Sequence, residues 1–308
     1  MTRKNIAVIG ECMIELSRNE NGLNQGFGGD TLNTAVYLAR QNKELAVHYV
    51  TALGTDTFSN EMLAAWQQEN VQTGFIQRME NKLPGLYMIE TDARGERTFY
   101  YWRNDAAARY WLEGEQAEEV CRQLANFDYL YLSGISLAIL TPTGREKLLA
   151  LLARCRSNGA KVIFDNNYRP RLWTSVDEAQ AAYRAILAVT DIAFLTLDDE
   201  HLLWGEADAA EVIARTHAAG VAEAIIKRGA EACLVSVAGE SLAEVPAQKL
   251  PASLIVDTTA AGDSFSAGYL AVRLSGGSVE EAARRGHLTA STVIQHRGAI
   301  IPLCAMPA

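Results

Sequence analysis

The sequence predicts an α/β fold with a mostly parallel central sheet, helices on both faces, and a small β-sheet lid. Short apolar runs alternate with helical segments along the chain, which is typical of a parallel sheet. One stretch of two β-type runs breaks this alternation and predicts the lid. The 308 residues, 49% hydrophobic and 21% charged, suffice for one large domain with an appendage or for two small domains. We expect a single domain over residues 1–308.

The predicted strands are short, and several are apolar throughout, as strands covered on both faces are. They comprise residues 6–9, 47–52, 129–133, 162–165, 192–195, 224–227 and 233–237. The predicted helices comprise residues 31–41, 59–69, 115–125, 143–157, 176–189, 209–219, 263–274 and 279–295. Ligands of such sheets bind at the carboxyl ends of the strands, where Asp165 and Lys227 stand.

The stretch that breaks the alternation reads as a β-hairpin. Residues 86–90 and 97–103 form two β-type runs, joined by a turn that contains glycine. Because side chains alternate between the faces of a strand, Tyr101 and Arg103 would lie on one face. Tyr87 stands in the first run and either belongs to the core of the lid or contacts a ligand.

A small-residue turn leads into the helix predicted at residues 263–274. The run from Asp257 to Asp263 reads Asp-Thr-Thr-Ala-Ala-Gly-Asp. The unpaired N–H groups and the positive dipole end at a helix start form an anion site. A carboxylate there makes sense if Asp263 takes a proton from a hydroxyl that attacks a phosphoryl group held by the amides. The alternative is that Asp263 only caps the helix.

A second glycine turn leads into the helix predicted at residues 31–41. It begins with Gly28 and Gly29, and a glycine pair permits positive φ and close approach of the backbone to a ligand. Asn33 lies in the first turn of this helix, where its amide can donate to and accept from a polyol.

Together, and in this order, the two motifs resemble the signatures of the ribokinase-like (PfkB) carbohydrate kinases. That family carries an early Gly-Gly…Asn motif and a late Asp-Thr-Thr-Gly-Ala-Gly-Asp motif, and here Ala260 stands where the family usually has Gly. The segment at residues 165–173, with the aromatic and arginine residues of the hairpin, resembles family members that act on keto-deoxy sugar acids. The resemblance covers residues 6–302.

The resemblance implies a ribokinase-like fold in which residues at about 11–17 and 85–104 form the lid over the sugar. In that family the lid also commonly forms a dimer interface, so we expect a homo-oligomer. It further implies ATP and a small-molecule sugar acid as substrates, with Mg²⁺ carried mainly by the nucleotide. If Ala260 requires a positive φ, it adds strain of roughly 1 kcal/mol or more.

The resemblance also assigns roles to individual residues. Asp263 matches the catalytic base, with Ala260, Ala261 and Gly262 forming the anion hole beside it. Arg169 would contact the transferred phosphate and the acidic substrate, or is otherwise a surface arginine. The expected substrate-binding residues are Gly29, Asn33, Tyr87, Tyr101, Arg103, Arg169 and Asp263. The expected nucleotide-binding residues are Asn167, Lys227, Gly229, Ala260, Ala261 and Gly262.

Two acidic residues are candidate partners of metal ions. Asp257 either caps a strand end or helps to order a monovalent cation such as K⁺. The family often has an Asn-x-x-Glu motif that organises Mg²⁺ water, whereas this chain has Leu-Asp-Asp-Glu at residues 197–200. Glu200 would keep the role on the metal side, acting through water.

Composition and missing motifs exclude several classes of protein. A net charge of −9 makes nucleic acid an unfavourable partner, so an anionic substrate must be held by a few local arginines. The five cysteines are scattered without a C-x-x-C pair, so they indicate neither a disulfide framework nor a zinc site. No apolar stretch resembles a signal peptide or spans a membrane, and we expect a cytoplasmic protein. The P-loop and dinucleotide-binding patterns are both missing.

The expected activity is ATP-dependent phosphorylation of the terminal 6-hydroxyl of a keto-deoxy sugar acid. One alternative is another sugar kinase of the family, acting on fructose or ribose. Such neutral substrates give no reason for Arg103 and Arg169 to converge. The other alternative is a non-catalytic sensor of sugars or nucleotides on the same fold, against which the intact Gly262 and Asp263 argue.

Overall fold

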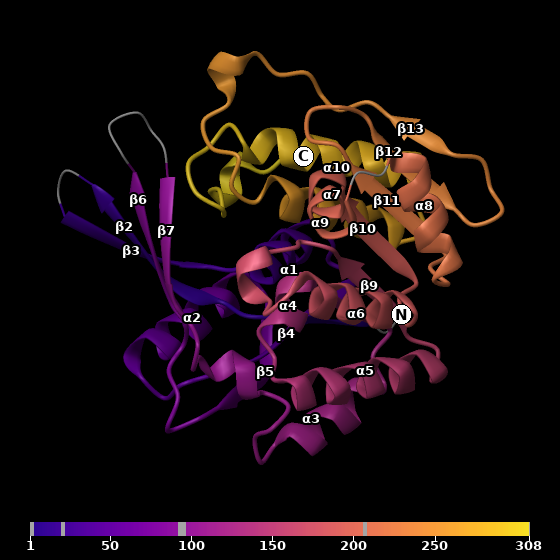
Figure 1. The fold of residues 1–308 in the computed structure, drawn as a ribbon. Helices are drawn as coiled ribbons and strands as arrows, with labels where there is room; N and C mark the ends of the chain where they lie inside the picture. Colours follow the sequence, from indigo (N-terminus) through magenta and orange to yellow (C-terminus); the bar gives the residue numbers. More distant parts are fainter. Residues whose placement is uncertain (1–2, 20–21, 92–96, 206–207, 308) are drawn as a thin grey trace.

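The computed structural model describes residues 3–19, 22–91, 97–205 and 208–307. Within them the chain forms two sheets of different size (Figure 1). The larger sheet has nine strands in the order β13-β12-β11-β10-β9-β8-β1-β4-β5. The smaller has four, in the order β3-β2-β6-β7, and extends beyond one side of the larger sheet. The predicted combination of a central sheet and a lid is confirmed.

The central sheet is parallel from β5 to β11, and only its last two described strands run antiparallel. Its strands are β1 (Lys4–Ile9), β4 (Leu45–Leu53), β5 (Gln72–Arg78), β8 (Tyr129–Ser133), β9 (Lys161–Asp165), β10 (Ile192–Thr196), β11 (Glu223–Lys227), β12 (Cys233–Val237) and β13 (Ala243–Val245). Because the middle strands are covered on both faces, their residues are almost all buried, as the apolar runs predicted.

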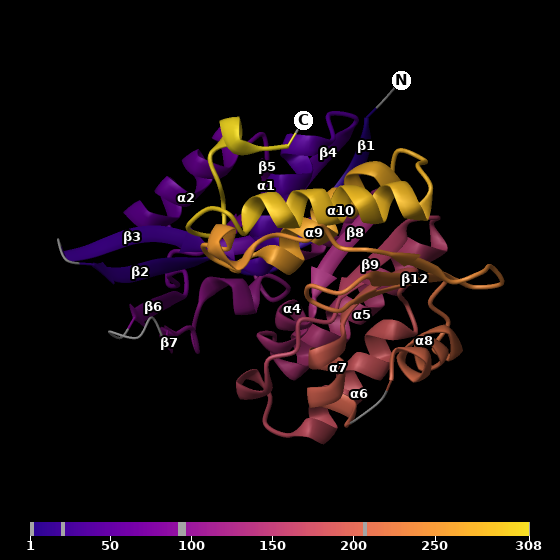
Figure 2. The same cartoon turned by 90° about the horizontal axis from the view of Figure 1, so that it is seen from above.

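The helices form two layers, one on each face of the central sheet (Figure 2). One layer contains α1 (Asp30–Gln41), α2 (Thr57–Gln68), α9 (Ala261–Arg273) and α10 (Val279–Val293). The other contains α3 (Ala117–Leu124), α4 (Gly134–Ala138), α5 (Pro142–Ser157), α6 (Val176–Leu187), α7 (Leu197–Trp204) and α8 (Ala209–Ala218). Alternate residues of β1 enter the two cores: Ile6 and Val8 on one side, Ala7 and Ile9 on the other.

The lid consists of β2 (Met13–Asn19), β3 (Gly22–Gly28), β6 (Leu86–Thr91) and β7 (Arg97–Trp102). The predicted hairpin is present, and Tyr87 pairs with Tyr101 across it. Its predicted turn includes residues 92–96, which lie outside the described residues. The prediction omitted β3, because that segment has three glycines and no β-branched residue, a composition that disfavours strands. It also omitted β5, β13, α4 and α7.

Helix length and hydropathy can be compared with what a lipid bilayer requires. A membrane-spanning helix needs about 20 mostly apolar residues. Among the described residues, we find no helix that meets this requirement in both length and apolar character.

Candidate active site

A cavity of about 710 Å³ lies at the carboxyl ends of the parallel strands, between the lid and α9. Most of the predicted site residues line it, although they come from distant parts of the chain. These residues are Gly29, Asn33, Tyr87, Tyr101, Asn167, Arg169, Lys227, Gly229, Ala260, Ala261, Gly262 and Asp263. The strand ends supply Asp165, and the start of α1 supplies Asp30. The location agrees with the rule for ligand sites in parallel sheets.

The N-terminus of α9 forms one wall of this cavity. Ala260 is the N-cap residue and has left-handed backbone angles, with φ of 60° and ψ of 17°. For a residue with a Cβ, this conformation costs about 1–2 kcal/mol. The Ala261 amide donates to the Thr258 carbonyl oxygen at 3.2 Å. Its N–H group is therefore already paired, which leaves fewer of the expected amides to bind phosphate. Helix geometry leaves the amides of Gly262 and Asp263 without partners within the helix.

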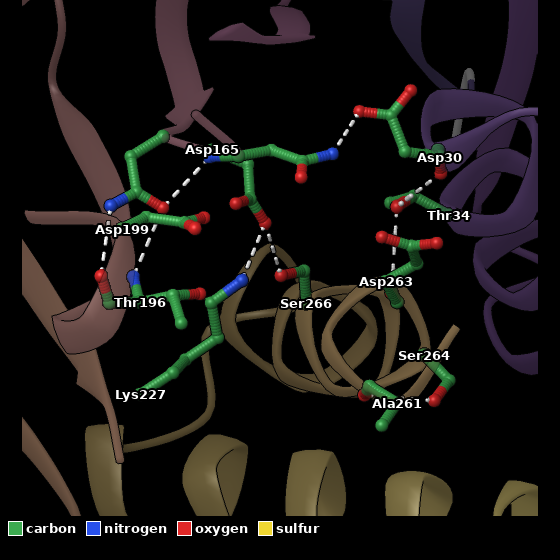
Figure 3. Close-up of polar contacts among 12 residues, drawn as sticks. Asp30, Thr34, Asp165, Thr196, Asp199, Lys227, Ala261, Asp263, Ser264 and Ser266 are labelled. Carbon is green, nitrogen blue, oxygen red and sulfur yellow. Dashed lines mark hydrogen bonds and ion pairs between the residues drawn. The ribbon is translucent and has the colours of Figure 1, made fainter. Parts of the chain in front are cut away.

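Asp263 lies in the first turn of α9 and points toward α1 (Figure 3). Its Oδ2 accepts a hydrogen bond from Asn33 Nδ2 at 2.9 Å, and its carbonyl oxygen accepts one from Thr34 Oγ1 at 3.4 Å. Burial raises the pKa of the Asp263 carboxyl to about 7, and the negative charges of Asp30 and Asp165 add to this effect. The Asn33 hydrogen bond and the charge of Lys227 oppose it. A base with such a pKa is well matched to proton transfer near neutral pH.

Asp165 and Lys227 form an ion pair across the ends of β9 and β11. Lys227 Nζ lies 2.8 Å from Asp165 Oδ2, and Ser266 Oγ donates to the same oxygen at 2.9 Å (Figure 3). The lysine is also close to the start of α9, because a Cβ placed on Gly262 would lie 3.4 Å from its Nζ. The ion pair therefore places the positive charge of the Lys227 side chain beside the candidate phosphate-binding amides.

Asp30 is a cavity residue that the sequence interpretation missed. It occupies the first turn of α1, and its Oδ2 accepts a hydrogen bond from Asn167 Nδ2. Asn167 has a positive φ of 28°, which turns the chain after β9 toward α1. The sequence did hold a signal for Asp30, because it is an acidic residue directly after the Gly28-Gly29 pair. It begins α1 and lies near Asp263, whose pKa its charge raises.

The two glycines before α1 are required by packing rather than by φ. Gly29 has a φ of 179°, which any residue adopts, and Gly28 is not among the described residues with positive φ. A Cβ on Gly29 would clash with the Glu11 carbonyl oxygen, and one on Gly28 with the Tyr87 hydroxyl. The expected use of positive φ is therefore wrong, whereas close backbone packing is observed.

The lid covers the cavity with an aromatic face. The ring of Tyr101 lies 6.0 Å from that of Tyr87 and stacks on Phe99 at 6.3 Å. The Tyr87 hydroxyl donates to Glu15 Oε2 on β2, which fixes its ring against the neighbouring strand. All three aromatic residues line the cavity, and Tyr101 remains 49% exposed. Such a surface can stack on a sugar while leaving the polar contacts to other residues.

Arg103 and Arg169 meet in a second cavity of about 750 Å³ that adjoins the first. Both cavities are lined by Met13, Phe99, Tyr101, Ile135 and Arg169. Arg103 follows directly after β7, is buried, and forms an ion pair with Glu11. Arg169 is about half exposed, donates to the Tyr168 carbonyl oxygen at 2.8 Å, and lies 3.4 Å from Asp199. Both arginines therefore line one cavity, which lies beside the main cavity.

The two candidate metal-side residues lie outside the cavity lining. Glu200 is buried and accepts hydrogen bonds from Arg215 and from Asn166 Nδ2, whereas its neighbour Asp199 lines the cavity. Asp257 accepts hydrogen bonds from the Thr259 hydroxyl at 2.6 Å and from the Gly298 amide at 3.0 Å. In the part of the chain that the structure describes, no three His, Cys, Asp or Glu side chains gather to hold a metal.

The comparison with known sequences agrees with this geometry. Residues 3–306 match the sequence profile described as pfkB family carbohydrate kinase. The chain therefore belongs to the pfkB family of carbohydrate kinases, as its two motifs predicted.

Two similar proteins of that family carry the same name. The 2-dehydro-3-deoxygluconokinase of Dickeya dadantii (strain 3937) is 71% identical over 310 residues, covering 100% of each chain. The 2-dehydro-3-deoxygluconokinase of Escherichia coli (strain K12) is 70% identical over 307 residues, covering 99% of each chain.

Solved structures show the same fold. A fructokinase with bound ATP from Xylella fastidiosa has a TM-score of 0.84 at 23% identity, over 99% of this chain and 95% of that one. A putative Ribokinase II from E. coli, in complex with ATP and Mg²⁺, has a TM-score of 0.81 at 21% identity, over 96% and 94%. The predicted ribokinase-like fold class is confirmed.

Proposed function

We propose that this chain transfers a phosphoryl group from ATP to the 6-hydroxyl of 2-dehydro-3-deoxy-D-gluconate, giving the 6-phosphate and ADP. The position of Asp263 carries the proposal, because it combines a carboxylate of raised pKa with a helix N-terminus in one cavity. The relatives that are 70–71% identical over the full chain, and named for this activity, support the choice of substrate.

Asp263 acts as the base in the proposed reaction. Its carboxylate accepts the proton of the 6-hydroxyl as the oxygen attacks the phosphoryl group. Asn33 donates to the carboxylate and thereby orients it. The amides at the start of α9, with the charge of Lys227 nearby, stabilise the negative charge on the transferred group.

The nucleotide occupies the part of the cavity between the strand ends and α9. Its expected contacts are Asn167, Lys227, Gly229 and the turn from Ala260 to Gly262, all of which line the cavity. Mg²⁺ would reach the site bound to the phosphates, where it neutralises charge, since the described residues offer no metal-binding cluster of their own. We further propose that K⁺ binds beside Asp257 and that Glu200 acts on Mg²⁺ through water.

The acidic end of the sugar lies at the arginine side of the cavity. Arg103 and Arg169 suit bidentate recognition of a carboxylate, and Tyr87 and Tyr101 form the aromatic surface beside them. Gly29 and Asn33 would contact the sugar from the α1 side. Because the 6-hydroxyl is at the opposite end of the molecule from the carboxylate, it is the hydroxyl that can reach Asp263.

We further propose that residues 1–308 act as one domain and that the lid joins two copies of the chain. The lid strand β7 exposes Tyr100 at 45% and Trp102 at 60%, and their sequence neighbours Phe99 and Tyr101 line the active-site cavity. An exposed aromatic surface of this kind is typical of a protein interface. Light scattering of the parent and of Trp102→Glu measures whether the lid sets the oligomeric state.

The activity is tested by an ADP-release assay with several sugars side by side at equal concentration. We expect 2-dehydro-3-deoxygluconate to give a kcat/KM at least about a hundredfold above fructose or ribose, because a neutral sugar lacks the carboxylate that Arg103 and Arg169 would bind. Equal rates with fructose or ribose would contradict the proposed substrate but would still support the proposed kinase activity. A wide panel of sugars and nucleosides that releases no ADP would favour a non-catalytic sensor.

A further inference from the structure

The Glu11–Arg103 ion pair lies where the chain passes between the two sheets. Glu11 precedes β2, Gly29 follows β3, Gly85 precedes β6, and Arg103 follows β7. A Cβ on Gly85 would lie 2.8 Å from Glu11 Oε1 and 3.2 Å from Arg103 Cβ. A Cβ on Gly29 would clash with the Glu11 carbonyl oxygen. Glu11 is thus in contact with all three of the other segments that connect the lid to the central sheet.

The pair is buried, and part of its hydrogen-bonding capacity is unused. The side chains are 1% exposed for Glu11 and 8% for Arg103. Burial raises the pKa of the Glu11 carboxyl, while the charges of Arg103 and Arg109 oppose that shift. Among the described residues, neither Glu11 Oε1 nor Arg103 Nε has a hydrogen-bond partner. Because such burial costs free energy, stability alone is a poor explanation for the pair.

Arg103 has one side in contact with Glu11 and another on the cavity that adjoins the active site. Its guanidinium has five N–H donors in a fixed plane, so one anchored nitrogen fixes the direction of the others. The guanidinium carbon also lies 6.0 Å from the ring centre of Tyr101, another cavity residue. A fixed direction matters, because small displacements of a binding group reduce the strength of a charged hydrogen bond.

We infer that Glu11 is a positioning residue, which holds the Arg103 guanidinium at the edge of the cavity so that its remaining donors can bind the carboxylate of the acidic substrate. The inference rests on the proposed function, since it needs a carboxylate-bearing substrate. Glu11 itself does not line either cavity. Its loss should therefore weaken sugar-acid binding and leave the chemical step unchanged.

The test is the steady-state kinetics of Glu11→Gln, a variant that keeps the size of the side chain and removes its charge. We expect KM for 2-dehydro-3-deoxygluconate to rise roughly tenfold, the lower end of what a charged hydrogen bond contributes. KM for ATP, and kcat at saturating sugar acid, should stay within about twofold of the parent. Equal increases in both KM values would show a purely structural role. A lower KM for the sugar acid would show that Glu11 competes with the substrate for Arg103, which also contradicts the inference.

A second variant keeps the inference testable if Glu11→Gln does not fold. Gly85→Ala adds one methyl group against both partners of the pair and against Met13 Cγ, and it changes no charge. It should raise KM for the sugar acid in the same selective way. The matched control is Gly74→Ala on β5, where an added Cβ meets no atom within 4 Å. If Gly85→Ala folds and behaves like its control, the inference is wrong.

The failure of this inference and that of the proposed function give different results. If the parent chain releases no ADP with the sugar acid, the proposed function fails, whatever Glu11 does. If the parent is active, and neither variant separates KM for the sugar acid from KM for ATP, only the role of Glu11 fails.

Discussion

The floor of the cavity and the lid above it are built in different ways. The floor, formed by Asp165, Lys227 and the first turn of α9, is held by hydrogen bonds at strand ends and helix starts. The lid presents side chains that are partly exposed, with Phe99 at 38% and Tyr101 at 49%. The floor can therefore hold the reacting groups in fixed positions, whereas the lid has exposed side chains that a bound ligand can cover. This division predicts that substitutions in the floor change kcat and that substitutions at the lid change KM.

The largest effect is expected for Asp263→Asn in the floor. The amide keeps the size of the side chain and cannot accept the proton, so kcat should fall by about two to four orders of magnitude. Steady-state ADP release measures this loss, with Asp198→Asn on the exposed side of α7 as the matched control. A kcat near that of the parent would show that Asp263 is not the base.

A smaller effect, on KM rather than on kcat, is expected for Arg103→Lys at the lid. Lysine keeps the charge beside Glu11 but lacks the planar fork that suits a carboxylate. KM for the sugar acid should rise about tenfold, while KM for ATP stays within about twofold. Arg122→Lys on α3, an exposed arginine, is the control. A loss of kcat at saturating substrate would contradict the division between floor and lid.

The pH profile tests the floor without any substitution. Burial and the neighbouring carboxylates raise the pKa of Asp263 to about 7, and only the deprotonated form can accept a proton. The value of kcat/KM should therefore fall about tenfold for each pH unit below about 7 and level off above it. A profile that stays flat down to a pH of about 5.5 would show that no base of raised pKa limits the reaction.

The smallest effect is expected for Ala260→Gly at the start of α9. Glycine removes the left-handed strain of about 1–2 kcal/mol, which stabilises the folded state. It also makes the unfolded chain more flexible, which destabilises the folded state by about 0.4–1 kcal/mol. The free energy of unfolding should thus rise by up to about 1.6 kcal/mol, which urea denaturation can measure. Ala214→Gly, on the exposed side of α8, should instead lower it by about 1 kcal/mol. A loss of stability in both variants would contradict the strain at residue 260.

The floor was easier to predict from the sequence than the lid. Asp263 follows a small-residue turn at a helix start, and this local pattern already indicates an anion site with a base. Asp30 was missed because its role depends on α1 meeting the end of β9, which no local pattern shows. The pairing of Arg103 with Glu11 likewise joins residues that are 92 positions apart. The central strands were predicted by their apolar runs, whereas β3 was not, because it is rich in glycine.

The most direct test of the division is calorimetric titration of 2-dehydro-3-deoxygluconate, without ATP, into the parent, Asp263→Asn and Arg103→Lys. If the floor performs the chemistry and the lid recognises the acid, Asp263→Asn should bind within about threefold of the parent, and Arg103→Lys about tenfold more weakly. The opposite pattern, with binding lost in Asp263→Asn and kept in Arg103→Lys, would show that the floor recognises the acid and would contradict the account.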